Sequence, residues 1–451
     1  MGATCDNDDD FKYCVGYWWS DKKSQKLNAN KLGALFAERR CKFVKLDFDK
    51  HLDQQGPFDV IVHKMGDILV KADQGDSQAK KTISAFESYV RKHPKMVILD
   101  ALDNTRALMD RYKQYRLIEQ SDLAKDNVVF TPTFVHLTST NIDVNRGRIR
   151  RSKITFPIVC KPILAQGSTG AHQMCIIFNE AGLKDVKPPC VAQSFVNHNA
   201  KLYKLFVIKD KYYIMERPSL KNFQAGDYET VFFFSHDISK PNSSSLLTEL
   251  DEADKLQLGQ LMEKWNNNMN ITEARETTLT TTKQTPISNP AALTKTKTIT
   301  ATTPTTITTT KESPNDEDAK QQMDIYRGNF IMNNGEGDWK NKQPTLQYQQ
   351  SPLMPSKEIL SKIVKIFSEK LGLTFYGIDI IIENGTNRYA IIDMNTFPGY
   401  DGVENFLTIF RDVVCDAIPE DIALDQKQAQ LTTTKLNKRK PTEHDSGIES
   451  T

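Results

Sequence analysis

The chain has 451 residues, too many for one ordinary hydrophobic core and enough for two or three domains. Its net charge is +2, without the basic excess typical of proteins that bind nucleic acids or membrane surfaces, so we expect neither partner. No apolar run approaches the ~18 residues of a membrane helix. Residues 6–10 are mostly acidic, unlike a signal peptide. We expect a cytoplasmic monomer, with nuclear access left open.

An α/β domain is predicted over residues 12–117, after a tail of residues 1–11 that we expect to be disordered. Short apolar runs alternate there with amphipathic stretches, which is typical of a parallel sheet flanked by helices. The predicted strands are Tyr13–Trp18, Phe43–Phe48, Phe58–His63 and Met96–Leu99. The predicted helices cover Leu27 to Phe36, Ser77–Arg91, and a segment through Tyr112 that Asp103 or Asn104 would cap.

Two further units are predicted beyond residue 117. The first, residues 118–215, carries strands around a loop of small residues, Gln166–Gly170. The second consists of residues 216–254 and 346–418, where an amphipathic helix over Ser356–Leu371 precedes a hairpin. Between the two pieces, 18 of the 39 residues from 272 to 310 are threonine. Such a tract buries little apolar surface, so we predict disorder for residues 255–345, and also for the tail of residues 419–451.

The hairpin is predicted to hold a divalent cation. Two β-rich runs, Thr374–Glu383 and Arg388–Met394, flank an Asn-Gly-Thr-Asn turn. A loop of three or five residues centred on Thr386 would place Asp379 opposite Asp393, with Cβ atoms ~4.5–5.5 Å apart. Strand alternation puts Asn395 on the same face as Asp393. Two carboxylates and an amide oxygen suit Mg²⁺.

The alternative for these acids is an ordinary solvated face of a hairpin. The nearly continuous apolar neighbours disfavour it, because they indicate that both faces are covered. A two-residue Asn-Gly turn would put the two aspartates on opposite faces and contradict the predicted geometry.

Cations gather where strands are predicted to end. Lys161 precedes the small-residue loop, and either supplies charge to phosphates or is an ordinary surface lysine beside a turn. Lys204 and Arg217 lie in later cationic stretches, which on their own could be solvated faces. Lys23 and Lys64 follow strands of the first domain. Ligands gather at the carboxyl ends of parallel strands, so several cations there imply a substrate with several phosphates.

Longer motifs give these pieces a family resemblance. The segments that carry it are Val15–Trp18 with Lys23, Asp59–Lys64, Pro189–Gln193, Asn197–Asn199, Arg217–Phe223, Gly377–Ile380, Asp393–Asn395 and Phe397–Tyr400. Together they resemble the inositol-tetrakisphosphate 1-kinases, also called inositol 1,3,4-trisphosphate 5/6-kinases. The resemblance covers residues 12–250 and 352–412.

The resemblance implies an ATP-grasp fold: an N-terminal parallel α/β domain on the substrate side, and two α+β lobes that clamp ATP. It implies ATP and inositol tris- or tetrakisphosphates as substrates, with Mg²⁺ as cofactor. The ATP contacts it implies are Arg106, Lys161, Gln193, Ser219, Ser235 and Ser239. The inositol phosphate contacts it implies are Lys23, Lys64, His172, Lys204, Asn395 and Gly399. The metal ligands it implies are Asp379, Asp393 and Asn395.

Lys204, Arg217 and Asp393 are the expected catalytic residues, because phosphoryl transfer depends on positioning and on neutralising charge. One departure concerns the loop Ala165–His172, which has Gln166 where animal relatives tend to have histidine, and one residue more. Two other functions remain open at this point. One is an ATP-grasp carboxylate–amine ligase, and the other is a catalytically inactive binding protein.

Overall fold

The structure, a computed structural model, describes residues 10–167, 169–263 and 354–419. Residues 264–345 of the threonine-rich insertion, and the two tails apart from residues 10, 11 and 419, lie outside the described residues. Residues 252–263 are helical, so the prediction of disorder from residue 255 is wrong for the first part of the insertion. The chain divides into two compact units, one of residues 1–255 and 355–451 and one of residues 256–354, and the sheets described below belong to the first. Within the described ranges, no helix is long and apolar enough to span a membrane.

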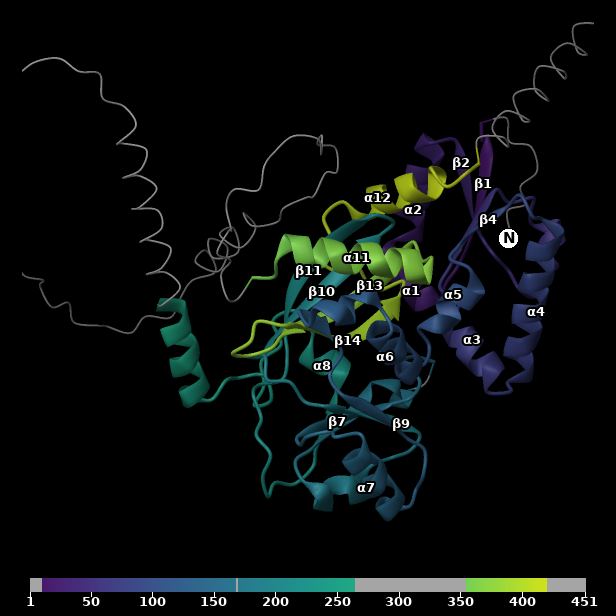
Figure 1. Cartoon of the computed structure of the whole chain (residues 1–451). Coiled ribbons are helices and arrows are strands. Elements are labelled where there is room, and N and C mark those ends of the chain that lie inside the picture. The colour runs from purple at the N-terminus through teal and green to yellow at the C-terminus, as the bar shows by residue number, and fades with distance from the viewer. Residues whose placement is uncertain (1–9, 168, 264–353, 420–451) are drawn as a thin grey trace, which may run out of the picture. The chain divides into compact units, whose positions relative to one another are not determined.

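The N-terminal domain contains the predicted parallel sheet. The strand order is β2 (Cys41–Lys45), β1 (Tyr13–Trp18), β3 (Val60–His63) and β4 (Val97–Leu99), and all neighbours are parallel. Its helices are α1 (Asp21–Leu27), α2 (Ala29–Glu38), α3 (Gly66–Asp73) and α4 (Ser77–Lys92) (Figure 1). The carboxyl ends of β1 and β3 therefore lie side by side, which brings the segments that carry Lys23 and Lys64 to one edge.

The helix predicted from Asp103 through Tyr112 is in fact two helices. The first, α5, spans Leu102–Ala107 and begins after Ala101, so Asp103 lies inside its first turn and does not cap it. The second, α6, spans Arg111–Glu119. Asp110 caps it, because its carboxylate accepts a hydrogen bond from the backbone N–H of Lys113. Arg111 is therefore the first residue of α6.

The rest of the described unit is built on two five-stranded sheets. One has the order β11 (Lys211–Pro218), β10 (Lys201–Ile208), β13 (Phe375–Ile382), β14 (Tyr389–Thr396) and β5 (Val129–Phe130). The other has the order β12 (Val231–Phe234), β8 (Gln173–Ile177), β7 (Ile158–Pro162), β9 (Cys190–Ser194) and β6 (Phe134–Leu137). The expected boundary at residue 215 is thus not where the sheets divide, since β10 and β11 pair into the hairpin sheet.

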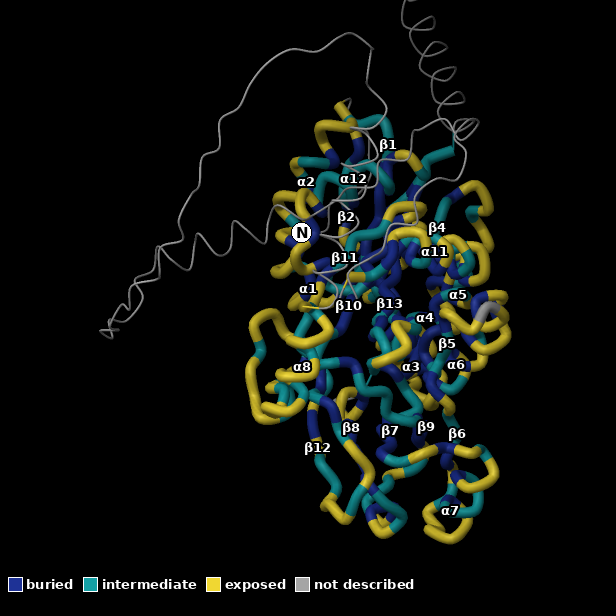
Figure 2. The backbone as a smooth tube through the Cα atoms, turned by 60° about the vertical axis from the view of Figure 1, so that its left-hand side comes forward, coloured by how far each residue is buried: buried dark blue, intermediate teal, exposed yellow. Residues whose placement is uncertain are grey.

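Helices with an apolar face pack on the β11-β10-β13-β14-β5 sheet, which contains the hairpin and is called the hairpin sheet. Helix α11 (Lys357–Leu371) starts at the Ser356 cap and buries Leu360, Ile363 and Phe367 in the same cluster as residues of β13 and β14. Helix α12 (Phe406–Cys415) joins an aromatic cluster that includes residues of β1. Helix α7 (Ile142–Arg151) packs in the lobe built on the β12-β8-β7-β9-β6 sheet. The short helix α8 (Ser235–Ile238) directly follows β12. Figure 2 shows the central strands mostly buried, with exposed backbone concentrated in loops and outer helix faces.

Candidate active site

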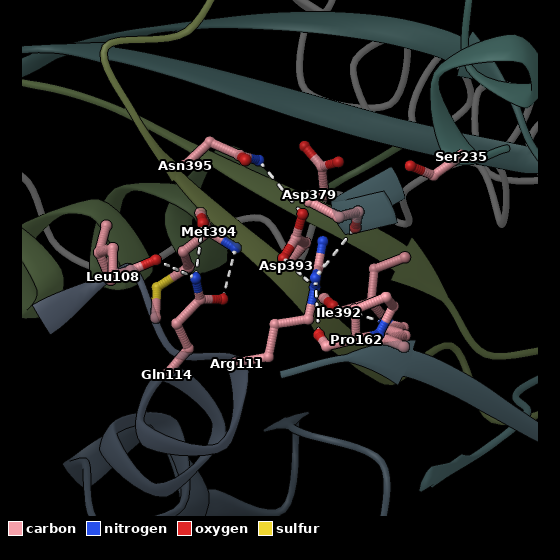
Figure 3. Close-up of polar contacts among 12 residues, drawn as sticks. Leu108, Arg111, Gln114, Pro162, Ser235, Asp379, Ile392, Asp393, Met394 and Asn395 are labelled. Atoms are coloured by element: carbon pink, nitrogen blue, oxygen red, sulfur yellow. Dashed lines mark hydrogen bonds and ion pairs between the residues drawn. The ribbon is translucent and has the colours of Figure 1, made fainter. Parts of the chain in front are cut away.

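The hairpin places the two aspartates opposite each other, as predicted. Asp379 on β13 pairs with Asp393 on β14, and Gly377 pairs with Asn395. Asp379 and Asp393 therefore face the same side of the sheet, with Asn395 two residues further along the strand (Figure 3).

The predicted reason for this pairing is wrong. Glu383 and Arg388 are hydrogen-bonded across the turn at 2.8 Å, so the loop between them has an even number of residues. With that turn alone, Asp379 would face Ile392. A β-bulge shifts the register, because Ile380 pairs with Ile391 while Asp379 pairs with Asp393. The extra residue, Ile392, thus turns Asp393 to the side of Asp379.

Asp379 is a buried carboxylate held by a lysine. Lys204 on β10 lies directly opposite it, and its Nζ donates to both carboxylate oxygens at 2.8 and 3.1 Å. Burial raises the pKa of Asp379, and the positive charge of Lys204 lowers it. The neighbouring carboxylate, that of Asp393, raises the pKa of Asp379 further. A cation between the two carboxylates would relieve their repulsion.

Asp393 has oxygen atoms left for a ligand. Its Oδ1 is buried without a hydrogen-bond partner, while Oδ2 accepts a long 3.4 Å bond from Asn395 Nδ2. In the described part of the chain, no cluster of three or more acidic, histidine or cysteine side chains could hold a metal. A metal here would therefore need the amide oxygen of Asn395, phosphate oxygens and water. The set fits Mg²⁺, which keeps several such ligands.

Lys161 lies next to the hairpin and is not a surface lysine. It is 6% exposed, and its Nζ donates at 2.9 Å to each of Tyr115 Oη, Gln193 Oε1 and the carbonyl of Ile392. The bulge residue thus supplies an acceptor to the lysine. Burial lowers the pKa of Lys161 to about 8, although Asp393 and Asp379 act in the opposite direction. This cation is poorly compensated, as a phosphate-binding group should be.

The three serines assigned to ATP lie in two places. Ser219, just after β11, is buried and shares a 2.7 Å hydrogen bond with His198 Nε2. Ser235 starts α8, and its Oγ is 3.3 Å from His172 Nδ1, while Ser239 Oγ donates to the Ser235 carbonyl. The resemblance assigns His172 to the inositol phosphate and Ser235 to ATP, yet the two side chains contact each other.

Lys23 and Lys64 converge on the segment after β14. Lys64 Nζ donates to the Phe397 carbonyl at 2.6 Å, and Lys23 Nζ donates to the Pro398 carbonyl at 3.2 Å. Burial lowers the pKa of Lys64 to about 8. Burial, with repulsion from Lys64 and Lys26, lowers that of Lys23 to about 7. Two desolvated amines therefore lie beside the strand that carries Asp393 and Asn395.

Gly399 and Arg217 belong to the same region. A Cβ on Gly399 would lie 2.5 Å from Asp401 Oδ2 and 3.2 Å from Lys26 Nζ, so a larger residue would displace the ion pair that these two exposed side chains form. Arg217 on β11 donates to the Asp401 carbonyl at 2.7 Å. Burial lowers the pKa of Arg217, while Asp401 and Asp379 raise it.

Arg106, which the resemblance assigns to ATP, forms its ion pairs with residues of the N-terminal domain. It lies on α5 and pairs with Asp103 at 3.0 Å, and with Asp73 and Glu87 at 3.7 Å each. These partners belong to α5, α3 and α4 of the N-terminal domain. These ion pairs give Arg106 a role within that domain, and its assignment to ATP remains a prediction.

Sequence reasoning missed the buried polar face of α6. Arg111, Gln114 and Tyr115 are each at most 1% exposed. Gln114 donates to the carbonyls of Leu108 and Met394 and accepts from the Met394 N–H, and Tyr115 donates to the Ile392 carbonyl. The sequence signal was present: three polar or amphipathic residues at spacings of three and four, on the face that a helix would bury.

Comparison with known proteins agrees with this geometry. The profile of the inositol 1,3,4-trisphosphate 5/6-kinase pre-ATP-grasp domain matches residues 14–105, and that of the family's ATP-grasp domain matches residues 123–268 and 325–416. The inositol-tetrakisphosphate 1-kinase of Xenopus laevis is 32% identical over 429 residues, covering 94% of this chain and 84% of the relative. That of Danio rerio is 34% identical over 395 residues, covering 87% and 76%.

Among solved structures, an ATP-grasp ligase of Chryseobacterium gregarium, in complex with ADP and a leader and core peptide, aligns with a TM-score of 0.44. It is 11% identical and covers 90% of this chain and 98% of its own. That likeness adds nothing to the assignment, which rests on the profiles and the two vertebrate relatives. The chain belongs to the inositol 1,3,4-trisphosphate 5/6-kinase family and consists of a pre-ATP-grasp domain followed by an ATP-grasp domain.

Proposed function

We propose that this chain transfers the γ-phosphate of ATP to a free hydroxyl of an inositol tris- or tetrakisphosphate. The observation that carries the proposal is the pair of opposed carboxylates between two sets of desolvated lysines. Lys161 lies on one side of the hairpin, and Lys64 and Lys23 contact the backbone at the end of β14. Each set suits one phosphorylated ligand.

The ATP phosphates would bind at Lys161. Its three acceptors are neutral groups, so no carboxylate hydrogen-bonds to the ammonium in the free protein. Gln193 orients the lysine and would remain in contact with ATP, and the serines after β11 and in α8 would supply neutral hydrogen bonds. A buried cation without a hydrogen-bonded counterion gains strongly from a polyanion, because the ligand removes its desolvation cost.

The inositol phosphate would bind where Lys23, Lys64 and Arg217 meet the segment from Phe397 to Asp401. The lowered pKa values of Lys23 and Lys64 reflect burial first and repulsion from neighbouring lysines second, and bound phosphate groups would offset both. Lys204, already 2.8 Å from Asp379, lies between this region and the metal hairpin. Asn395 would serve both the metal and the substrate.

Asp379, Asp393 and Asn395 would hold Mg²⁺, which when bound neutralises phosphate charge and orients the nucleotide. The residues of the chain supply the remainder. Lys204 and Arg217 place positive charge beside the transferred group, where negative charge accumulates during phosphoryl transfer. The aspartates serve as metal ligands and are not needed as a general base.

The test is ADP release by purified full-length protein with Mg-ATP and a panel of inositol phosphates, carboxylates and amines. The proposal predicts ADP release that depends on an inositol tris- or tetrakisphosphate, together with a product carrying one phosphate more. Release that requires a carboxylate and an amine would instead establish a ligase. Inositol phosphate binding without turnover would establish a binding protein.

A further inference from the structure

Arg111 is a buried cation at the start of α6. Its side chain is 1% exposed, and its ion-pair partner Asp393 is 3.6 Å away. Burying a guanidinium costs several kcal/mol unless its donors are satisfied. The proposed transfer mechanism does not use this arginine directly.

One side of the guanidinium closes the small-residue loop. Arg111 Nη1 donates to the carbonyls of Pro162 and Leu164 at 2.9 Å each, and to that of Ala171 at 3.3 Å. Pro162 and Leu164 lie at the start of the loop and Ala171 lies at its end. The backbone N–H of Arg111 also donates to Ile163 at 2.9 Å. One side chain thus ties together the two ends of the segment that follows Lys161.

The other side of the guanidinium faces the hairpin. Arg111 Nε is buried without a hydrogen-bond partner, and so is Asp393 Oδ1, the atom 3.6 Å from it. Figure 3 shows Arg111 extending between Asp393 and Pro162. The two unpartnered atoms are a short movement away from a charge-assisted hydrogen bond. The arginine therefore lies between the loop and a carboxylate of the hairpin.

We propose that Arg111 is a positioning residue that couples the order of loop 162–172 to the orientation of Asp393. The metal role of Asp393 rests on the function proposed above, whereas the coupling itself does not. A guanidinium presents several donors in a rigid plane, so it can contact the loop carbonyls and the carboxylate together. A lysine keeps the charge but offers a single donor group on a flexible stem.

Arg148 on α7 provides a control, because its guanidinium also donates to a backbone carbonyl. Its Nη1 donates to the His136 carbonyl at 3.0 Å and to Thr138 Oγ1 at 2.6 Å. It thus ties backbone as Arg111 does, but no contact given by the structure joins it to the hairpin. Arg148→Lys should lower stability locally without changing loop 162–172.

The first experiment measures hydrogen exchange in nucleotide-free full-length protein. Arg111→Lys should raise exchange in residues 162–172 about tenfold, the loss expected for hydrogen bonds from a charged group. Arg148→Lys should leave that segment at the wild-type rate. Calorimetry with ADP then separates the roles: Arg111→Lys should shrink the gain in ADP affinity that Mg²⁺ gives, which loss of stability alone would not change.

A second variant decides the matter if Arg111→Lys does not fold. Asp393→Asn removes the carboxylate charge on β14 and leaves the loop sequence intact. The coupling predicts faster exchange in residues 162–172 of this variant, without any ligand. Wild-type exchange there in Asp393→Asn, or in a folded Arg111→Lys protein, would overturn the proposal. If Mg²⁺ fails to increase ADP affinity in the wild-type protein, the metal assignment fails separately, since the exchange result does not depend on it.

Discussion

Replacing Lys161 with methionine tests whether this buried lysine is kept for ATP. Methionine keeps the approximate length and apolar stem but removes the charge and the donors. The three acceptors around it, Tyr115 Oη, Gln193 Oε1 and the Ile392 carbonyl, lose their 2.9 Å partner. The protein therefore loses hydrogen bonds and also the cost of a buried charge.

The two contributions can be estimated from the structure. Burial lowers the Lys161 pKa from 10.5 to about 8, which corresponds to about 3 kcal/mol of destabilisation by the charged form at pH 7. Because Tyr115 Oη donates to the Ile392 carbonyl, these two groups stay hydrogen-bonded to each other in the variant. Gln193 Oε1 is then the acceptor left unpaired, at a cost of about 1–3 kcal/mol. The terms oppose each other, so we expect only a small change in unfolding free energy at pH 7. The loss of a charged contact to phosphate should weaken ATP binding roughly tenfold to a hundredfold.

The pH dependence of stability isolates the charge. The folded-state pKa of Lys161 is below its unfolded value, so the unfolded chain binds more protons between about pH 8 and 10.5. Wild-type stability should therefore rise relative to Lys161→Met with increasing pH, by about 2 kcal/mol from pH 7 to pH 10. Urea unfolding at several pH values measures the slope, and calorimetry with ATP measures affinity.

Lys113→Met is the control, because Lys113 lies on α6, as Tyr115 does, but its side chain is exposed. It should show wild-type ATP affinity and a wild-type pH slope. Wild-type ATP affinity in Lys161→Met, or a stability that follows the same pH slope as that of the wild-type protein, would refute this role of the buried charge.

Three other predictions concern the metal, the substrate lysines and the domain contact. Asp393→Ala should abolish turnover with little change in circular dichroism, and a wild-type rate would disprove the metal assignment. Lys23 and Lys64, with pKa values lowered to about 7 and 8, should take up protons when an inositol phosphate binds at pH 8. Calorimetry in buffers of different ionisation enthalpy measures that uptake, and its absence would contradict the site. The carboxylate of Asp100 accepts from two N–H groups at the start of β13, at 2.7 and 3.1 Å, so Asp100→Asn should lower the unfolding free energy by about 1–3 kcal/mol. Unchanged urea unfolding would contradict that estimate.

The hairpin shows how far sequence reasoning can reach. Alternation and a loop of three or five residues predict that Asp379 faces Asp393, and the pairing confirms this outcome. They could not show the bulge, because Ile391 and Ile392 are both apolar and no break in the pattern marks the extra residue. The correct pairing thus came from a wrong turn length.

The division into sheets was less accessible. The unit predicted over residues 118–215 includes β10 and most of β11, and nothing local in the sequence indicates whether such strands pair with β9 or with β13. Only the register, in which Lys204 faces Asp379, shows that β10 belongs to the hairpin sheet. The same limit applies to Arg106, whose carboxylate partners Asp73 and Glu87 come from other helices.

Arg111 shows a different limit. A charged residue beside a helix cap is usually exposed, so its type and position gave no reason to select it. Its burial depends on the loop after β7 and on the bulged strand, two segments far apart in sequence. A helix face carrying Arg111, Gln114 and Tyr115 could have been noticed, although its partners could not.

The central claim is transfer of phosphate to an inositol hydroxyl, and a label on the γ-phosphate of ATP follows that transfer directly. Purified full-length protein would be incubated with γ-labelled Mg-ATP and an inositol tris- or tetrakisphosphate, and the products separated by anion exchange. The account predicts label in an inositol phosphate with one phosphate more than the substrate, and none in that product for Asp393→Ala. Label found only in free phosphate or on the protein would contradict it.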